Sequence, residues 1–561
     1  MDFMNRKLFK LSLVSSAILA TTQVSAALYN VVEITPNTSF SYKSSYGVAI
    51  EPAATTGASD NCFESGAAIS GSCSSFKLAG ETRVNVMNSG EAVDGLSYRE
   101  EAPFGMDNQF AYIQSFSDFE NYCEAQLGFS TCSAWASPRW NIWSNENSNS
   151  EPNSIAFIGA STTGISLDEG NNLVINSISP AGDAVGISSG LKNVSGFRRG
   201  SVSSWIENSA IGPTGVLQSR AWARDDTYTV GSVADSEAND NGTFYTSKAA
   251  IWLNSSSTPV QIAWEAGVNS RVSNRLAQGS MRDFVISGTT IYGVGFNTYD
   301  SSNNYMNATV FVSDTTDIST WSSKVVSNAR AVVNSEKIHS NSVLTSINKN
   351  LVAIGNAKRD GSAPYKGAAP NRLFIVPNVS QTSLSATFPS GGILFEGAGG
   401  KAGAINNYNE IVGQIDFDST REIDGKTRRK RGFIYPYNAA GSDITRMARF
   451  ANKAWYLDDL TNDGSLSGNN QYRVVDATDI NDAGVISGTA LKCSGGYSTT
   501  SHNASCSGTE TVVAVKLVPI AGATSSNISQ RSTDTTTSER SGGSLGLWSL
   551  ILLALGWFRR K

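Results

Sequence analysis

The sequence contains few of the residues that enzymes and metal proteins most often use for chemistry. Only two histidines, His339 and His502, occur among 561 residues, and no cysteines are spaced as C-x-x-C. Because zinc sites are built from His and Cys at such spacings, a zinc centre is not expected. Charged residues make up only 16% of the chain and the net charge is −5. The composition therefore argues against nucleic acid as a partner, which would need a basic face.

Apolar runs long enough for a comfortable membrane span are also missing from the two chain ends. In residues 1–26, basic residues precede the short apolar run 11–20, and Val24-Ser25-Ala26 follows it. This order is typical of a secretory signal peptide that is cleaved between Ala26 and Ala27. An uncleaved N-terminal membrane anchor is the alternative. We therefore expect an exported protein.

The cysteine content is low but even. An even number of cysteines in an exported chain favours disulfides, and six cysteines allow fifteen connectivities. We prefer the three local pairings because each closes a short polar loop, and such a bridge typically contributes about 2–4 kcal/mol. The predicted bridges are Cys62–Cys73, Cys123–Cys132 and Cys493–Cys506.

A strand–turn–strand pattern that ends in glycine recurs along the chain. Its clearest copy is the segment 479–488, with sequence DINDAGVISG. Asn and Asp bond to their own nearby backbone and Gly accepts positive φ, so residues 481–484 predict a tight hairpin loop. Gly488 marks a position where a side chain would be in the way or a bulge is needed.

The same unit explains most of the chain. Each copy is followed by a polar loop and an aromatic-rich strand, which predicts an all-β fold, a β-propeller of about seven blades over residues 27–519. An ordinary β-sandwich rich in Asn-Gly turns is the alternative. We expect the first strand, 27–34, to pair with 511–519 and close the ring. The other copies end at Gly186, Gly231, Gly295, Gly355 and Gly413.

The C-terminal region has two parts. Residues 520–541 are rich in Ser and Thr and predict a disordered linker. Residues 542–561 begin Gly542-Gly543-Ser544, continue with the apolar run 547–558 and end in basic residues. This tail resembles the GlyGly-CTERM sorting signal of Gram-negative bacteria. The resemblance implies a short transmembrane helix, transient anchoring in the inner membrane, cleavage near Gly542 and Gly543 by a rhombosortase, and delivery to the cell surface or medium. A permanent C-terminal anchor is the alternative.

The repeats also suggest a family. The segments 480–488 and 405–413, followed by strands such as 431–435, resemble the HAF-type repeats of bacterial extracellular proteins. Gly432 or Leu373 precedes the aromatic residue, and the histidine usual in the repeat is absent. The whole layout resembles an uncharacterised exported bacterial family built on a domain of unknown function. This resemblance implies no catalytic residues.

Two glycine-rich motifs could indicate enzymes but fit poorly. Residues 186–190 match the G-x-S-x-G pattern of serine hydrolases, which requires a strand-to-helix elbow. A polar stretch and another strand follow instead. The segment 397–401 is similar to a phosphate-binding loop but lacks its opening glycine, and Ala402 replaces the required Ser or Thr. We expect a strand and a loop, respectively.

Two groups of acidic residues and one basic run remain. Acidic loops can hold calcium, and calcium is the one cofactor that the sequence leaves open. The spacing of the acidic residues in neither group matches an EF-hand loop. Paired acids could also serve a glycosidase. The basic run 426–431 could contact anionic polysaccharide or lipid headgroups. We predict solvated loop charge for all three. The acidic groups are Asp416, Asp418 and Asp424, and Asp458, Asp459 and Asp463.

The sequence therefore predicts a secreted or surface-delivered, non-catalytic binding or scaffold protein. A secreted hydrolase acting on polysaccharide or another extracellular polymer is the alternative. The partners expected during export are signal peptidase and a rhomboid-type sorting protease. Outside the cell we expect a glycan or protein ligand. No catalytic, cofactor-binding or metal-binding residue is predicted.

Overall fold

The computed structural model describes most of the chain between Ala27 and Thr533. The described residues are 27–533, apart from 54–60, 65–72, 85–115, 125–129, 138–139, 141–151, 190–201, 210, 241, 274, 300, 303, 330, 334–335, 340–341, 359–364, 367, 369–370 and 422–427. The predicted signal peptide, Ala26, Gly542, Gly543 and the apolar run 547–558 lie outside them. Within the described part, no helix is long and apolar enough to cross a membrane.

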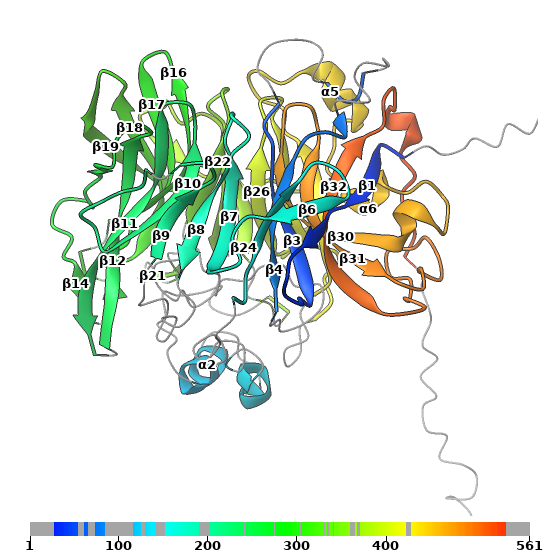
Figure 1. The fold of residues 1–561 in the computed structure, drawn as a ribbon, viewed down its shortest axis with the longest axis horizontal. Coiled ribbons are helices and arrows are strands. Elements are labelled where there is room, and N and C mark those ends of the chain that lie inside the picture. The colour runs from blue at the N-terminus through cyan, green and yellow to red at the C-terminus, as the bar shows by residue number, and fades with distance from the viewer. Residues whose placement is uncertain are drawn as a thin grey trace, which may run out of the picture.

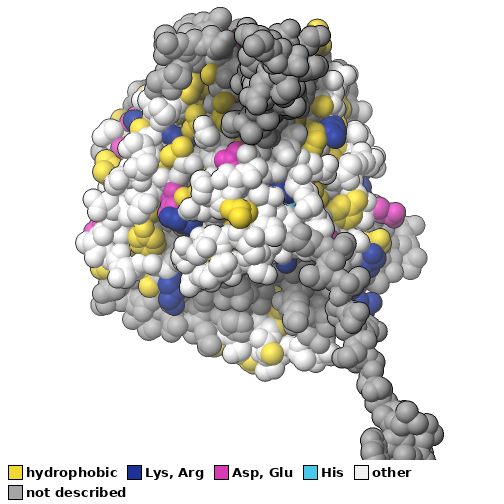
Figure 2. All heavy atoms as spheres, turned by 90° about the vertical axis from the view of Figure 1, so that its right-hand side faces the viewer, with side chains coloured by type: hydrophobic (Ala, Val, Ile, Leu, Met, Phe, Trp, Pro, Cys, Tyr) yellow, Lys and Arg dark blue, Asp and Glu magenta, His cyan; other side chains and the backbone are white. Residues whose placement is uncertain are grey.

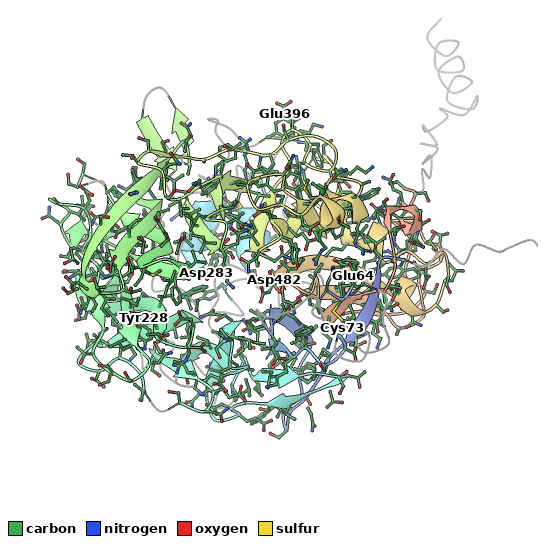
Figure 3. All side chains as sticks on the ribbon, turned by 90° about the horizontal axis from the view of Figure 1, so that it is seen from above. Glu64, Cys73, Tyr228, Asp283, Glu396 and Asp482 are labelled. Atoms are coloured by element: carbon green, nitrogen blue, oxygen red, sulfur yellow. A yellow bond between two sulfur atoms is a disulfide. The ribbon has the colours of Figure 1, made fainter. Side chains whose placement is uncertain are left out.

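Apart from two short ribbons, the described strands form seven sheets, the blades of a β-propeller, which are arranged around a centre in the view from above (Figure 3). The all-β propeller prediction is therefore confirmed. Blade 1 contains β3 (Ser44–Ile50), β4 (Leu78–Arg83), β5 (Ala156–Gly159), β6 (Thr163–Ser166) and the added β2 (Thr35–Asn37). Blade 2 contains β7 (Asn172–Ile178), β8 (Ala184–Ser189) and β9 (Val202–Ile206). Blade 3 contains β10 (Gln218–Arg224), β11 (Tyr228–Asn239), β12 (Gly242–Leu253) and β13 (Val260–Gln261).

The remaining blades follow in chain order. Blades 4 and 5 contain β16 (Ser280–Ser287), β17 (Thr290–Thr298), β18 (Met306–Asp314), β19 (Asp317–Ser327) and the added β25 (Leu384–Ser385), then β22 (Val343–Ile347), β23 (Ala353–Lys358) and β24 (Asn371–Val376). Blades 6 and 7 contain β26 (Gly400–Ile405), β27 (Glu410–Asp416), β28 (Lys430–Pro436) and β29 (Trp455–Tyr456), then β30 (Tyr472–Ile480), β31 (Ile486–Cys493), β32 (Glu510–Pro519) and β1 (Tyr29–Glu33).

Small elements decorate the blades. Two-stranded ribbons are formed by β14 (Arg271–Val272) with β15 (Arg275–Leu276), and by β20 (Ala331–Val333) with β21 (Glu336–His339). The described helices include α2 (Phe116–Tyr122), α5 (Ile444–Arg449), α6 (Leu457–Leu460) and the 3-10 turns η3 (Gly468–Gln471) and η4 (Ser525–Asn527). Residues 132–137 are also helical. Helices α2 and α5 lie at opposite ends of the propeller axis (Figure 1).

The innermost strands form a closed ring. The first strand of each blade contacts the first strand of the next, in the order β3, β7, β10, β16, β22, β26 and β30, and β30 contacts β3 again. Apolar layers fill the spaces between blades. Val310 of blade 4, for example, packs in one cluster with Leu344 and Phe374 of blade 5. Each blade buries its apolar faces only against its neighbours, so the ring must close to complete the core.

Strand β1 closes the ring, as predicted. It pairs antiparallel with β32, and Tyr29 lies opposite Pro519 and Val31 opposite Leu517. Lys516, on β32, donates from Nζ to backbone carbonyls that flank blade 1, at 2.6–2.8 Å. The first and last blades are therefore joined by both backbone and side-chain bonds.

A β-bulge interrupts the innermost strand of every blade. In each case a glycine on the second strand pairs with the residue that precedes the bulge. A Cβ atom at Gly231 would lie 1.8 Å from the carbonyl oxygen of Arg220, and one at Gly186 would lie 2.1 Å from that of Val174. These contacts are far too short, so only glycine fits. The glycines are Gly80, Gly186, Gly231, Gly295, Gly355, Gly413 and Gly488; the sequence pattern predicted all of them except Gly80.

The three predicted disulfides are present. The structure pairs Cys62 with Cys73, Cys123 with Cys132 and Cys493 with Cys506, at Cα separations of 5.5–5.8 Å. No described cysteine is free. The first bridge fixes the segment that carries Phe63, whose ring packs against Tyr29 and Phe450.

The predicted linker needs a correction. The sequence placed a disordered linker at 520–541, but residues 520–533 follow the surface of blade 7 and make defined contacts. Arg531 is buried and Ile528 packs partly against the apolar core. Polar composition misled the prediction because the binding partners of this segment are buried charges, which lie far away in the sequence. Residues 534–541 lie outside the described part.

Candidate functional site in the axial channel

The bulge residues mark where solvent reaches the propeller axis. The residues directly before the bulge are buried in every blade, whereas the bulge position is partly exposed in six of the seven. Because the innermost strands surround the axis, we call the region that these positions surround the axial channel. In chain order they are Val48, Asn176, Trp222, Arg282, Thr345, Gly403 and Thr478, of which only Arg282 is buried.

Two carboxyl groups follow the bulge, Asp283 in blade 4 and Asp479 in blade 7. Asp283 Oδ2 accepts hydrogen bonds from the Ile347 backbone N–H at 2.9 Å and from Ser346 Oγ at 3.0 Å, both in blade 5. Asp479 Oδ2 accepts the backbone N–H of Ile50, in blade 1, at 2.9 Å. Each carboxyl therefore ties its own blade to the next. Asp283 lies near the middle of the ring in the view along the axis (Figure 3).

Both carboxyl-bearing residues are partly buried. Burial raises the pKa of Asp283 to about 6, although its hydrogen-bond donors act in the opposite direction. Burial also raises the pKa of Asp479 to about 7, and the charge of Asp283 adds to this effect. Since blades 4 and 7 lie on opposite sides of the ring, this repulsion acts across the channel. We call the two groups the acid pair because both follow the bulge and burial raises the pKa of both.

An aromatic and cationic stack lies beside the acid pair. The guanidinium carbon of Arg282, in blade 4, lies 3.5 Å from the ring centre of Trp222, in blade 3. Such stacking is favourable because the face of the indole ring is electron-rich. The indole N–H of Trp222 has no hydrogen-bond partner among the described residues. One face of the Trp222 ring is therefore covered by Arg282, and its indole N–H is buried and unpaired.

A chain of asparagines forms part of the channel rim. In three consecutive blades the side-chain amide of a turn asparagine donates to a backbone carbonyl in the next turn. Asn348 donates to Asn406 at 2.8 Å, Asn406 to Asn481 at 3.1 Å, and Asn481 to Glu51 at 2.9 Å. The same side chains cap their own turns, as the sequence predicted. Their oxygen atoms accept local N–H groups, for example Val485 N–H at Asn481.

The enzyme-like motifs lie outside the channel. Residues Gly186–Ser189 form part of strand β8 and pair with both neighbouring strands. Ser188, the serine of the motif, therefore does not lie on a strand-to-helix elbow. His502 is buried beyond the edge of blade 6, with Nε2 3.0 Å from Asp459 and its ring against Phe417. The side chain of His339 lies outside the described residues. Gly400 and Lys401 belong to strand β26, whereas Gly397 lies in the loop before it.

The charged groups at blades 6 and 7 need a correction, because they are not solvated loop charges. Asp416 is buried and pairs with Arg428 at 3.0 Å and with Lys430 at 2.5 Å. Arg431 is buried and pairs with Asp458 at 2.8 Å. Asp416 and Asp458 therefore form buried ion pairs with residues of the basic run, which single-segment reasoning missed. The predicted exposure holds at Arg429 and in part at Asp418 and Asp463, while Asp424 and residues 426–427 lie outside the described residues.

The charged side chains on the face near blade 7 and the metal-ligating groups of the described residues show no concentrated feature. Figure 2 shows Lys, Arg, Asp and Glu side chains as small separate groups among polar residues on the face near blade 7. Within the described ranges, no three His, Cys, Asp or Glu side chains are grouped so that they could hold a metal ion. The channel is therefore the best-defined candidate site in the described part of the chain.

Comparisons with known proteins add a family and several distant structures. A family model described as a protein of unknown function (DUF3466) matches residues 220–561. No curated protein matches the chain. A crystal structure of a protein of unknown function from Dyadobacter fermentans is 10% identical, with a TM-score of 0.34, covering 87% of this chain and 98% of that one.

Two further structures are similar at a lower level. The β-propeller domain of the Trilobed protease from Pyrococcus furiosus is 7% identical, with a TM-score of 0.31 and coverage of 61% of this chain and 81% of that one. A GH32 β-fructofuranosidase from Bombyx mori is 11% identical, with a TM-score of 0.26 and coverage of 49% and 64%, respectively.

Proposed function

Because this chain belongs to the DUF3466 family of proteins of unknown function, we propose its role from its own residues: an exported, non-catalytic binding protein that holds a glycan or protein ligand at the axial channel. One observation carries the proposal. The channel wall is partly exposed and polar at the bulge positions Asn176, Thr345 and Thr478. Its two carboxyl groups are committed to inter-blade hydrogen bonds. The site is thus built to contact a ligand with a fixed polar surface.

The arrangement of acids and bases supports binding over catalysis. Asp283 and Asp479 each accept backbone N–H groups, which hold the blades in place. No described histidine, cysteine or lysine lies beside either carboxyl group to form a nucleophile–base pair. His502 is held in a separate buried network. The channel therefore offers recognition groups without a recognisable reactive centre.

Export is supported by the disulfides and by the sequence. Three disulfides are typical of an oxidising compartment, because cytosolic thiols are kept reduced. The basic and apolar pattern at 1–26 and the Gly-Gly tail at 542–561 indicate the same route. We therefore place the binding role at the cell surface or in the medium, after transient anchoring in the inner membrane.

The chemistry of the channel favours a neutral polar ligand. Asn176, Thr345 and Thr478 place one amide and two hydroxyl groups at partly exposed positions, where each also donates to a backbone carbonyl of the protein. Trp222 adds a partly exposed aromatic ring. Aromatic rings with neighbouring hydroxyl and amide groups suit sugar rings and peptide segments, which have both apolar faces and hydrogen-bonding edges. We favour a glycan, and a peptide segment is the other ligand of this chemistry.

Binding to an array of bacterial and algal polysaccharides tests the proposal. We expect the Trp222→Ala variant to lose at least about tenfold in affinity for any glycan that the protein retains, the loss typical of a central aromatic contact. Trp321→Ala is the matched control because Trp321 lies on the outer strand β19. Equal affinity of both variants, or no binding to any glycan or surface protein, would contradict the proposal.

A polysaccharide hydrolase is the second candidate, and the acid pair favours it. Carboxyl groups with pKa values near 6 and 7 have the strength required of a general acid and base. A hydrolase would release reducing ends from a polymer, and Asp283→Asn and Asp479→Asn would each abolish that release. Turnover of a polysaccharide that is lost in both variants, with the fold intact, would replace the binding proposal.

A further inference from the structure

The segment after the last blade strand lies in a groove on blade 7 as a peptide ligand would. Residues 520–533 contain no strand that pairs with the sheet. They are held mainly by side chain to backbone bonds. Arg449 Nη1 donates to the carbonyl of Ala523 at 2.7 Å, and Asn462 Nδ2 donates to that of Ser529 at 2.9 Å. Ile528 adds a partly buried apolar contact. We call residues 523–533 the C-terminal strap.

Arg531 makes the densest set of contacts in the strap. Its backbone N–H donates to Asp459 Oδ1 at 2.8 Å, and its Nε donates to the Asp458 carbonyl at 2.6 Å. Its Nη1 donates to the carbonyl of Thr500 at 2.8 Å and also to Asn470 Oδ1. The side chain is 3% exposed. A planar guanidinium group can donate hydrogen bonds to several acceptors in fixed directions, which suits this set of acceptors better than an ammonium group does.

The acceptors of this groove are held by the rest of blade 7 and its neighbour. Asp458 Oδ1 accepts the Val474 N–H at 2.8 Å, and Asp458 Oδ2 pairs with Arg431. Asn470 Oδ1 also accepts from Arg473 Nη1 at 3.2 Å. These bonds do not involve the strap. The pocket for Arg531 therefore keeps its shape when the strap leaves.

The strap is held with some hydrogen-bonding groups unpaired, which limits how strongly it is bound to blade 7. Three buried polar atoms around it have no hydrogen-bond partner: Nη2 of Arg531, Nδ1 of His502 and Oδ2 of Asp459. Each such atom offsets part of the stabilisation that the paired atoms provide. A segment without ladder pairing and with unpaired buried atoms opens more easily than the sheet beneath it.

We propose that blade 7 carries an arginine-reading peptide groove, which the chain's own C-terminal strap fills and which can open and refill while the propeller stays folded. The ligand class is an extended peptide with an arginine flanked by small polar residues. The strap leads directly into residues 534–561, which contain the predicted processing position. The groove therefore fixes the point on the propeller where that tail begins.

Complementation in trans tests the groove directly. In full-length Arg531→Ala protein the pocket is empty, so a labelled synthetic peptide of residues 523–533 should bind, as followed by fluorescence anisotropy. The same peptide with Arg531→Ala should bind at least about tenfold more weakly, the loss of one charge-assisted hydrogen bond. Arg421→Ala is the matched control because Arg421 is exposed. That variant should bind the peptide no better than the wild-type protein, whose own strap competes.

Two results would overturn the proposal. One is the absence of peptide binding to a folded Arg531→Ala protein, and the other is equal binding of the two peptides. Hydrogen exchange on the wild-type protein covers the case in which that variant does not fold. The backbone N–H groups of Arg531 and His502, which are bonded to Asp459 and Ser532, should exchange together. They should exchange at least about tenfold faster than Thr489 in the middle of β31. Equal exchange rates would show that the strap is an inseparable part of the blade.

Discussion

The side-chain amide of Asn406 lies 3.1 Å from the backbone carbonyl of Asn481, in the corresponding turn of the next blade. The same amide also donates to the Glu410 carboxylate, while its oxygen caps its own turn by accepting the N–H groups of Tyr408 and Glu410. One side chain therefore shapes a turn and joins two blades. Local turn chemistry and ring assembly depend on the same residue.

Replacement of Asn406 tests this double role. We expect Asn406→Ala to lower the free energy of unfolding by about 1–3 kcal/mol, because buried partners lose their hydrogen bonds. Asn406→Asp should destabilise more, since its carboxylate would face Glu410 and a carbonyl. Urea unfolding followed by tryptophan fluorescence measures both. Asn378, which caps only its own exposed turn, is the control. A larger loss in Asn378→Ala than in Asn406→Ala would contradict the inter-blade role.

The blade glycines allow a second test. Gly231→Ala would place a methyl group 1.8 Å from the Arg220 carbonyl, so the bulge or the neighbouring strand must move. We expect a loss of about 1–3 kcal/mol, typical of overpacking in a core. At Gly212 the nearest atom lies 3.9 Å away and the backbone is not left-handed, so Gly212→Ala should stay within about 0.5 kcal/mol of wild type. Thermal unfolding distinguishes the two.

The channel acids predict a specific pH dependence. Their folded-state pKa values, about 7 for Asp479 and about 6 for Asp283, lie above the ordinary value of 3.8. At pH values between the unfolded and the folded pKa, the folded protein holds more protons than the unfolded chain. The contribution of the two carboxyl groups to stability therefore falls as the pH rises from about 4 to 7. We expect Asp479→Asn to flatten the decline in unfolding free energy between pH 5 and pH 8. An unchanged slope would show that Asp479 does not titrate in this range.

A buried ion pair joins helix α5 to blade 6. Arg446 donates from Nε and Nη2 to the two carboxylate oxygens of Glu410, at 3.0 and 2.6 Å, and both side chains are almost fully buried. Removing one partner of such a pair typically destabilises by about 3–5 kcal/mol, because the other charge stays buried. We expect Glu410→Gln to approach that loss. Asp240→Asn removes the charge from an exposed pair with Arg271 and should change stability by no more than about 1 kcal/mol. Chemical denaturation at constant pH compares them, and similar losses in both variants would contradict the prediction.

Processing makes a prediction that is independent of the fold. If both end signals act as proposed, the secreted chain begins at Ala27 and ends near Gly543. Intact-mass spectrometry of protein from the culture medium measures both ends. Changing Gly542 and Gly543 to Val should keep the chain in the membrane fraction, because a rhomboid-type protease needs small, flexible residues near its cut. A mature chain that retains Lys561 would contradict the proposed cleavage.

The sequence by itself determined the blade unit. The Asn481 turn and the Gly488 position depend on interactions within about ten residues, between a turn side chain and its own backbone or between neighbouring strands. The disulfides followed for the same reason, because each joins cysteines close in the chain. The charged groups failed as predictions because their partners come from other segments, as when Asp416 meets Lys430 on the neighbouring strand. Arg531 lies 73 residues from the Asp458 carbonyl that it bonds, so composition alone indicated a linker.

Only the tertiary structure decided which residues meet at the axis. Asp283 and Asp479 come from blades 4 and 7, and Trp222 meets Arg282 across a blade boundary. No local pattern marks these residues, because their shared feature is a position at or directly after the bulge in strands that become neighbours only after the ring closes. Local hydrogen bonds and sterics therefore define each blade, while ring closure brings distant side chains together and creates the channel and the groove.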